Sequence, residues 1–341
     1  MLRNINSAIT SHLLASHGTL RQVKRFKTTK QKLQASFERN RLLFIIRVLV
    51  IVAAVFVLVT QRTFWTPDTL FVVFLFISAV FGQARAFLIR FLPLLLLITL
   101  YELFRGFADD LNGTVHYVEM IDIDRLMFFG QLPTVVLQEW WWKGSVQWYD
   151  FYFYFLYTIH FLMPLLLAVL IWRKKPAYYW QFMWALVGLS FAAFLTYILY
   201  PAAPPWMASW QGYIDEPMRR VSSDIWWAMG VKNFAEVYNN LPANQVAAVP
   251  SLHSAYPLLF SLFITGLFGL KRFWWVYFYP ISLWIGVTYM GEHYVIDVIL
   301  GALYAALIYY MSVWAFNWYY MEDRPLRAKI NALMARLHLS S

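Results

Sequence analysis

The sequence predicts an all-α integral membrane protein with about eight transmembrane helices. Of its 341 residues, 61% are hydrophobic and only 13% are charged, whereas a soluble domain carries about 25% charged residues. Apolar segments close to the length that crosses a bilayer as a helix, about 20 residues, recur along the chain. Tryptophan and tyrosine gather at their ends, as in the aromatic belts of membrane proteins. This composition excludes a disordered chain and argues against a soluble enzyme.

Eight segments are apolar and long enough to be membrane spans. The second is the weakest, because Pro67 and Asp68 stand at its start, and Arg47 is the main charge inside any span. The two longest connections, residues 108–147 and 201–249, fall on the same outer side, where long loops usually cover a site. The predicted spans are residues 42–60, 65–82, 91–107, 148–172, 178–200, 251–270, 273–290 and 294–316.

The charge distribution orients these spans. The formal net charge is +10, from 28 Lys and Arg against 18 Asp and Glu. Most basic residues lie in the terminal segments and in the turns on the same side, for example Arg173, Lys174 and Lys271. By the positive-inside rule, both termini face the cytoplasm of a multi-pass cell-membrane protein. The positive charge therefore contacts the bilayer surface, and we expect no nucleic-acid partner.

The spans and the charges divide the chain into four regions. Residues 1–41 form a basic arm that is expected to lie on anionic lipid as an amphipathic cytoplasmic helix. A mitochondrial transit peptide is the alternative for this arm, since such peptides are also basic and poor in acidic residues. Two N-terminal transmembrane helices follow in residues 42–90, then a membrane domain in residues 91–316 and a cytoplasmic tail in residues 317–341.

Two short polar segments on the outer side hold the candidate catalytic residues. Residues 249–254 read Val-Pro-Ser-Leu-His-Ser, and residues 291–297 read Gly-Glu-His-Tyr-Val-Ile-Asp. From His253 the chain crosses the membrane in about 18 residues, or about 27 Å at 1.5 Å per residue. It then turns and returns over a similar length to His293. Both histidines are therefore predicted at the same outer level.

The residue types in these segments suit phosphate chemistry. Pro250 fits the first turn of a helix, which would leave the amide of Ser251 and the next two amides free to bind an anion such as phosphate. His293 and Asp297 are four residues apart and share a helix face, and a carboxylate on one imidazole nitrogen raises the nucleophilicity of the other. One histidine can then attack phosphorus while the other protonates the leaving oxygen. Metal ligation by this pair with His253 is an alternative, although no further ligand is suitably spaced.

These motifs resemble the signature blocks of a known family. The stretch at residues 200–206, Tyr-Pro-Ala-Ala-Pro-Pro-Trp, and the Pro-Ser-Leu-His form look like the inositol phosphorylceramide synthase branch of the type-2 phosphatidic acid phosphatase superfamily. The resemblance covers roughly residues 91–316 and implies a six-helix catalytic bundle whose site faces away from the cytoplasm. The motifs similar to the second and third blocks are Pro250-Ser251-Leu252-His253 and His293-Tyr294-Val295-Ile296-Asp297.

The resemblance also implies roles for individual residues. His293 would be the nucleophile, Asp297 its partner, His253 the general acid and Ser251 a phosphate ligand. The chain departs from the family where phosphate is usually clamped. The usual Lys and Arg of the first block are absent from residues 200–206, and Gly286 and Val287 stand where the third block has Ser-Arg.

Other outer cations must therefore approach the phosphate. Arg105 is the main candidate, because an arginine at the end of a span is costly without a partner; a structural ion pair with Asp109 or Asp110 is the alternative. Lys232 and Tyr289 are further candidate phosphate or substrate ligands. We expect Arg219 and Arg220 to be solvated loop residues, and His116 and His160 to be structural.

The leading hypothesis is a membrane-embedded enzyme that transfers phosphoryl groups of lipid phosphates or phospholipid headgroups through a phosphohistidine. Water as the acceptor would make it a lipid phosphatase, and a polyol such as inositol would make it a phosphotransferase. We expect no cofactor and no bound metal, and the sequence does not indicate the oligomeric state. The alternative is a lipid transporter or scramblase without catalysis, which predicts polar residues spread through several spans.

Overall fold

A computed structural model gives the fold of most of the predicted membrane domain. The predicted arm 1–41, residues 321–341 of the predicted tail 317–341 and most of the spans 42–60 and 91–107 lie outside the described residues, so the count of eight spans stays a prediction. The structure describes residues 67–80, 82–92, 113–160, 162–230 and 245–320, together with the isolated residues 45, 48, 49, 52 and 95.

The chain divides into two compact units, residues 1–64 with 73–85, and residues 65–72 with 86–341. The described part of the first unit is mainly the later part of helix α3 (Pro67–Val80). This helix lies within the second predicted span and begins at Pro67, a residue that suits the first helical turn because its missing N–H has no partner there. The second unit holds every candidate site residue that the structure describes.

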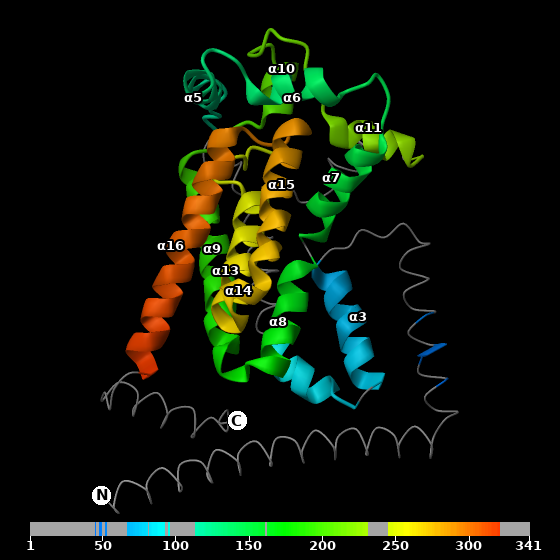
Figure 1. The fold of residues 1–341 in the computed structure, drawn as a ribbon, viewed down its shortest axis with the longest axis vertical. Coiled ribbons are helices and arrows are strands. Elements are labelled where there is room, and N and C mark those ends of the chain that lie inside the picture. Colours follow the sequence, from blue (N-terminus) through cyan, green and yellow to red (C-terminus); the bar gives the residue numbers. More distant parts are fainter. Residues whose placement is uncertain are drawn as a thin grey trace, which may run out of the picture. The chain divides into compact units, whose positions relative to one another are not determined.

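Every regular element in the described residues is a helix, and these residues form no β-strand, which confirms the all-α class. The second unit contains long apolar helices and, at the end where α15 finishes and α16 begins, several short helices (Figure 1). The longer helices are α7 (Trp148–Ile159), α8 (Met163–Lys174), α9 (Tyr179–Leu199), α13 (Leu252–Phe268), α15 (Phe278–Tyr289) and α16 (Val295–Tyr320). The short helices are α5 (Glu119–Met127), α6 (Pro133–Trp141), α10 (Pro205–Trp210) and α11 (Val221–Ala228).

Two of the described helices are long and apolar enough to cross a membrane. They are Pro176–Leu199 and Val295–Tyr319, and they match the predicted spans 178–200 and 294–316. The predicted span 148–172 corresponds to two helices, α7 and α8, which together are long and apolar enough to cross a membrane but are bent by 55°, as in a broken span or a re-entrant loop. Pro164 lies in the first turn of α8, where its ring excludes the carbonyl four residues earlier and so ends the preceding helix.

The short helices replace what the sequence suggested were two long outer loops. Helices α5 and α6 lie within residues 108–147, and α10 and α11 lie within residues 201–249. Extended backbone joins the two regions, because Ala202 forms isolated parallel bridges to His116 and to Ala247. The end of the second unit where α15 finishes and α16 begins is therefore built from short elements tied together by main-chain hydrogen bonds.

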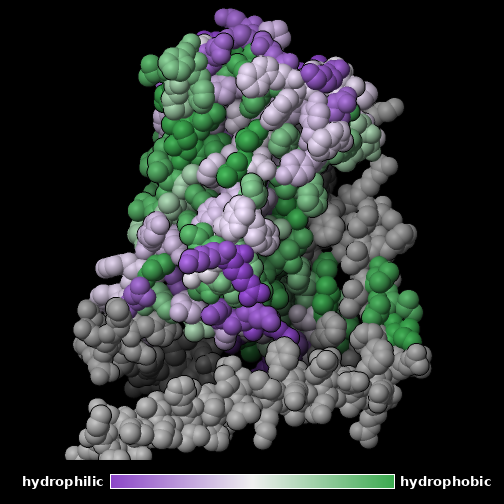
Figure 2. All heavy atoms as spheres, viewed as in Figure 1, coloured by the Kyte–Doolittle hydropathy of each residue, from purple (hydrophilic) through white to green (hydrophobic). Residues whose placement is uncertain are grey.

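The core of the second unit lies where α13 packs against α16, α15 and α9. Gly301 allows α16 to pack closely against the start of α13, since a Cβ at this position would stand 2.2 Å from the Ser251 carbonyl oxygen. Large side chains such as Phe182, Leu189 and Phe263 are almost fully buried between these helices. Apolar residues cover the middle of the face shown in Figure 2, with hydrophilic residues toward both ends, as expected of a bilayer-spanning core.

Candidate active site

His293 lies in the tight turn between α15 and α16. Gly291 opens this turn with φ of +77°, a left-handed conformation that favours glycine. A Cβ at this position would also stand 2.9 Å from the Arg219 carbonyl oxygen. The turn therefore requires glycine for both its backbone conformation and its contact with Arg219. It places His293 two residues before Val295, the first residue of α16.

His253 lies in the first turn of α13. The side chain of Ser251 caps this helix by accepting a hydrogen bond from the Ser254 amide at 3.2 Å, and the Ser251 amide donates to the Asp297 carbonyl oxygen at 3.1 Å. Pro250 precedes the cap and lies two positions before the first residue of α13, so it is not in the first helical turn as predicted. Because the Ser251 amide is already bonded, it is not one of the free amides predicted to bind an anion.

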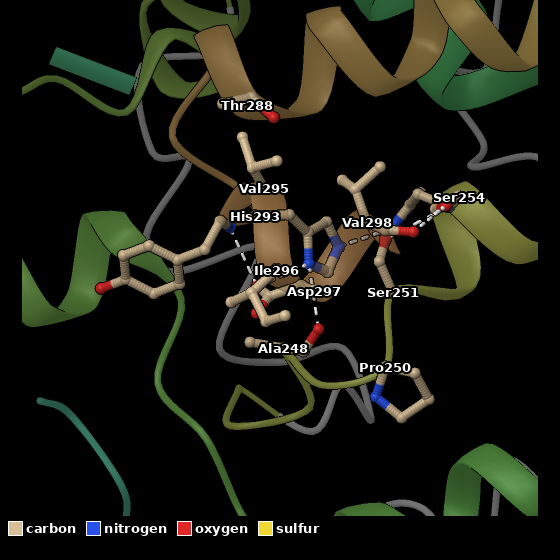
Figure 3. A network of polar contacts seen from close by, with 12 residues as sticks. Ala248, Pro250, Ser251, Ser254, Thr288, His293, Val295, Ile296, Asp297 and Val298 are labelled. Atoms are coloured by element: carbon tan, nitrogen blue, oxygen red, sulfur yellow. Dashed lines mark hydrogen bonds and ion pairs between the residues drawn. The ribbon is translucent and has the colours of Figure 1, made fainter. Parts of the chain in front are cut away.

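The structure brings the two histidines together. Nδ1 of His253 lies 3.1 Å from Nε2 of His293, and Nδ1 of His293 lies 3.1 Å from the Ala248 carbonyl oxygen. A carbonyl oxygen only accepts, so Nδ1 of His293 carries the proton and donates it to Ala248. Nε2 of His293 then holds a lone pair that faces His253. Figure 3 shows His293 between Ala248 and the start of α16.

Asp297 supports the same imidazole from one helical turn away. Its Oδ2 lies 3.5 Å from Nδ1 of His293 and accepts the Tyr294 amide at 2.9 Å. The carboxylate is fully buried, and its Oδ1 has no hydrogen-bond partner in the described part of the chain. A negative charge at this place stabilises a positively charged His293, while the nearer Ala248 carbonyl sets the tautomer.

Aromatic rings surround His253. Its imidazole stacks on Tyr157 with ring centroids 4.2 Å apart, and the His160 ring centroid is also 4.2 Å away. His160 was expected to be a structural group in the middle of a span. The structure places it at the C-terminal end of α7, buried beside His253, and Pro164 was the sequence signal for the helix break that puts it there.

Two carboxylates that were not predicted as site residues hold the His293 turn. Asp124 of α5 accepts the amides of Val295 and Ile296 at 2.9 and 3.0 Å. Glu292 pairs with Arg220, whose Nε lies 3.0 Å from Oε1, and it accepts a hydrogen bond from the Ser222 hydroxyl. Sequence reasoning assigned no role to Asp124 or Glu292.

Arg220 corrects a sequence-based expectation. It was predicted to be a solvated loop residue, yet its side chain is only 4% exposed and its guanidinium lies 4.1 Å from the centre of the Trp206 ring. Its neighbour Arg219 is 53% exposed and pairs with Asp224. Two adjacent arginines in a polar loop look identical in sequence, because nothing local distinguishes the one that meets a buried glutamate.

The remaining candidate ligands lie apart from the histidine pair or outside the described residues. Arg105 and Lys232 fall in the segments 96–112 and 231–244, which the structure does not describe. The Tyr289 hydroxyl donates to Asp150 at 2.7 Å, within a group of aromatic rings on α6 and α7. His116 stacks on Tyr200. Among the described residues, no three His, Asp or Glu side chains are grouped to hold a metal ion.

The fold and this site define a helical membrane protein with a paired-histidine centre at one end of its bundle. The profile described as the PAP2 superfamily matches residues 119–311. This match spans more than half of the chain, so the protein belongs to the PAP2 superfamily, as the two sequence motifs indicated.

Curated relatives point to the same branch as the Pro-Ser-Leu-His form. The chain is 30% identical over 155 residues to a phosphoinositol dihydroceramide synthase of Bacteroides thetaiotaomicron, covering 42% of this chain and 49% of that protein. It is 29% identical over 157 residues to an inositol phosphorylceramide synthase of Candida albicans, covering 44% of this chain and 33% of that protein. The chain thus spans about half or less of the curated relatives it matches. No solved structure matches it.

Proposed function

We propose that the protein is a membrane-embedded enzyme that transfers phosphoryl groups of lipid phosphates or phospholipid headgroups through a phosphohistidine on His293. The observation that carries this proposal is the geometry at His293: Nδ1 lies 3.1 Å from the Ala248 carbonyl oxygen, which favours the tautomer with its proton on Nδ1, and Nε2 lies 3.1 Å from Nδ1 of His253. A neutral imidazole with a directed lone pair and a second histidine beside it are the nucleophile and the proton donor that such a transfer needs.

The proposed reaction has two steps. In the first, Nε2 of His293 attacks phosphorus, a P–N bond forms, the P–O bond to the leaving lipid alkoxide breaks, and His253 gives its proton to that oxygen. In the second, an acceptor hydroxyl attacks phosphorus, the P–N bond breaks, and the acceptor proton passes to His253. Asp297 stabilises the positive charge that His293 carries between the two steps. The substrate phosphate must displace the hydrogen bond that joins the two rings.

The relatives' names suggest which donor and acceptor to test first. They contain a phosphoinositol group and a ceramide or dihydroceramide. We therefore take phosphatidylinositol as the first donor and dihydroceramide as the first acceptor, with phosphatidic acid and water as the hydrolytic pair and a free polyol as a third acceptor. In the proposed topology both termini lie in the cytoplasm and the histidine pair lies at the outer face.

Trapping the covalent intermediate tests the proposal. Purified full-length protein is incubated with phosphatidylinositol or phosphatidic acid labelled with 32P, quenched, and analysed for a protein-bound label that is stable to base and labile to acid. The wild type and the control His116→Gln, whose histidine lies outside the pair, are expected to carry the label. His293→Ala is expected to carry none and to lose turnover.

The outcomes separate the two functional classes. Equal labelling or equal turnover in the wild type and His293→Ala would eliminate the phosphohistidine. Movement of labelled lipid between leaflets without any labelled protein would favour the transporter alternative. Label that passes to dihydroceramide, rather than to water, would identify the lipid hydroxyl as the acceptor.

A further inference from the structure

Asp124 is a buried carboxylate that the proposed chemistry does not use. It lies on α5 with a fully buried side chain, and its two oxygens accept the amides of Val295 and Ile296. These amides belong to the first turn of α16, where N–H groups have no partner within the helix. A carboxylate at a helix N-terminus meets both these donors and the positive end of the helix dipole.

The cap is unusual because it comes from far away in the chain. An N-cap is normally supplied by the residue that begins the helix, but Asp124 is separated from Val295 by 171 positions. Burying a carboxylate is costly unless it is well paired, so the two bonds to the start of α16 offset the burial of Asp124. The nucleophile candidate, His293, lies two residues before the first of these bonded amides.

A second charged contact holds the other side of His293. Glu292 immediately precedes it and is bonded by both Arg220 and Ser222 at the start of α11. Arg220 and Glu292 are 4% and 7% exposed, so this ion pair is shielded from water and from salt screening. His293 is therefore flanked by a buried contact from α11 and a buried contact from α5.

We propose that Asp124 and the Arg220–Glu292 pair are positioning residues that fix His293 in the orientation required for attack. The expected effect on kcat rests on the proposed function, whereas the expected effect on the start of α16 rests on the geometry alone. Helices α5 and α11 then belong to the active site, because together they hold the turn that carries the nucleophile. Losing either contact leaves His293 in place along the chain but free to tilt away from phosphorus.

The ionisation of Asp124 gives this role a pH signature. Burial raises the pKa of Asp124 to about 6, and the nearby Asp297 acts in the same direction. Asp297 and the Tyr294 phenol are the titratable groups that face it from the start of α16. Protonation of Asp124 turns one acceptor oxygen into a hydroxyl donor. One of the two bonds to α16 is therefore weakened as pH falls through about 6.

The first test compares Asp124→Asn with Asp122→Asn, a control on the same helix whose carboxylate is exposed. Asparagine keeps one acceptor oxygen, so one bond to α16 is lost with little change of shape. We expect faster hydrogen–deuterium exchange in peptides that cover residues 294–298, and a kcat lower by about 10- to 100-fold with KM unchanged. In the wild type, kcat should rise as the pH increases through about 6, because Asp124 ionises. This rise should be absent from Asp124→Asn and present in Asp122→Asn.

The second test neutralises the other contact without leaving a lone buried charge. The double variant Arg220→Gln with Glu292→Gln is compared with Arg219→Gln with Asp224→Asn, a pair of the same type that is partly exposed. We expect the first double variant to lower kcat and the second to leave it unchanged. The thermal unfolding midpoint of each double variant is measured in detergent, and kcat is compared well below both midpoints. Loss of folded protein then does not imitate loss of positioning.

The outcomes distinguish this proposal from the proposed function. If the wild type is labelled at His293 but Asp124→Asn matches Asp122→Asn in exchange and in kcat, the positioning role is wrong and the proposed function stands. Faster exchange with unchanged kcat also overturns the positioning role. If the wild type transfers no phosphoryl group, the proposed function fails, and the exchange rates alone decide whether Asp124 holds the start of α16.

Discussion

The two histidine segments are held in different ways, although they meet at one hydrogen bond. The segment around His293 is fixed by main-chain and charged contacts: the Ala248 carbonyl, Asp297, Asp124 and the Arg220–Glu292 pair. His253 is half-buried, follows a serine cap, and is bordered by the rings of Tyr157 and His160. The difference matches the two proposed tasks, because a nucleophile needs a fixed direction and a proton donor must serve first one oxygen and then another.

Among the changes that keep His293, the largest effect is expected from removing the proton donor. His253→Ala should slow transfer by about 10²- to 10⁴-fold, yet His293 keeps its tautomer and can still attack. A lipid phosphate with a 4-nitrophenyl leaving group needs little protonation, so most of the lost rate should return with this substrate. His293→Ala should show no such recovery. If both variants recover equally, or neither does, the division of tasks between the histidines is wrong.

A smaller effect is expected from separating the two segments. Gly301→Ala places a Cβ only 2.2 Å from the Ser251 carbonyl oxygen. The start of α13 must therefore move away from α16. Overpacking of this kind costs about 1–3 kcal/mol of stability, and the displaced His253 should lower turnover by about 100-fold. Thermal unfolding and turnover in detergent measure the two effects. Gly188→Ala in α9 is the control, because nothing lies within 4 Å of its added Cβ.

The smallest effect is expected at the aromatic border of His253. Tyr157→Leu removes the ring that stacks on the imidazole, and an aromatic contact of about 0.5–1.5 kcal/mol corresponds to about a two- to tenfold loss of turnover. The exposed Tyr152 of the same helix supplies the control, Tyr152→Leu. A loss in Tyr157→Leu as large as that of His253→Ala would mean that the stacking ring, and not the imidazole alone, is essential to proton transfer.

Local sequence patterns were sufficient for two of the long helices and for the pairing of the histidines. The apolar lengths predicted α9 and α16, and equal lengths on either side of one turn predicted that His253 and His293 lie at the same level. The contacts that hold His293 were beyond such reasoning. Asp124 is separated from its partners by 171 positions, and no spacing rule links an acidic residue in a presumed loop to the amides of a distant helix.

Errors of the sequence interpretation have a common physical cause. Residues 148–172 are mostly apolar and aromatic, so hydropathy could not reveal the bend between α7 and α8 that brings His160 beside His253. Arg220 was taken as solvated because charge usually implies exposure. Its burial depends on Glu292 and Trp206, which come from two other parts of the chain, and only the tertiary fold brings these groups together.

The hydrogen bond from His293 to Ala248 has a consequence for how this site tolerates change. The group that sets the tautomer is a main-chain carbonyl, which every amino acid possesses. No single substitution at position 248 deletes it, and a survey of side-chain replacements would rank the position by size alone. The most decisive acceptor in the centre is thus invisible to mutational scanning, and backbone chemistry, such as an ester in place of the amide bond, is the way to alter its strength.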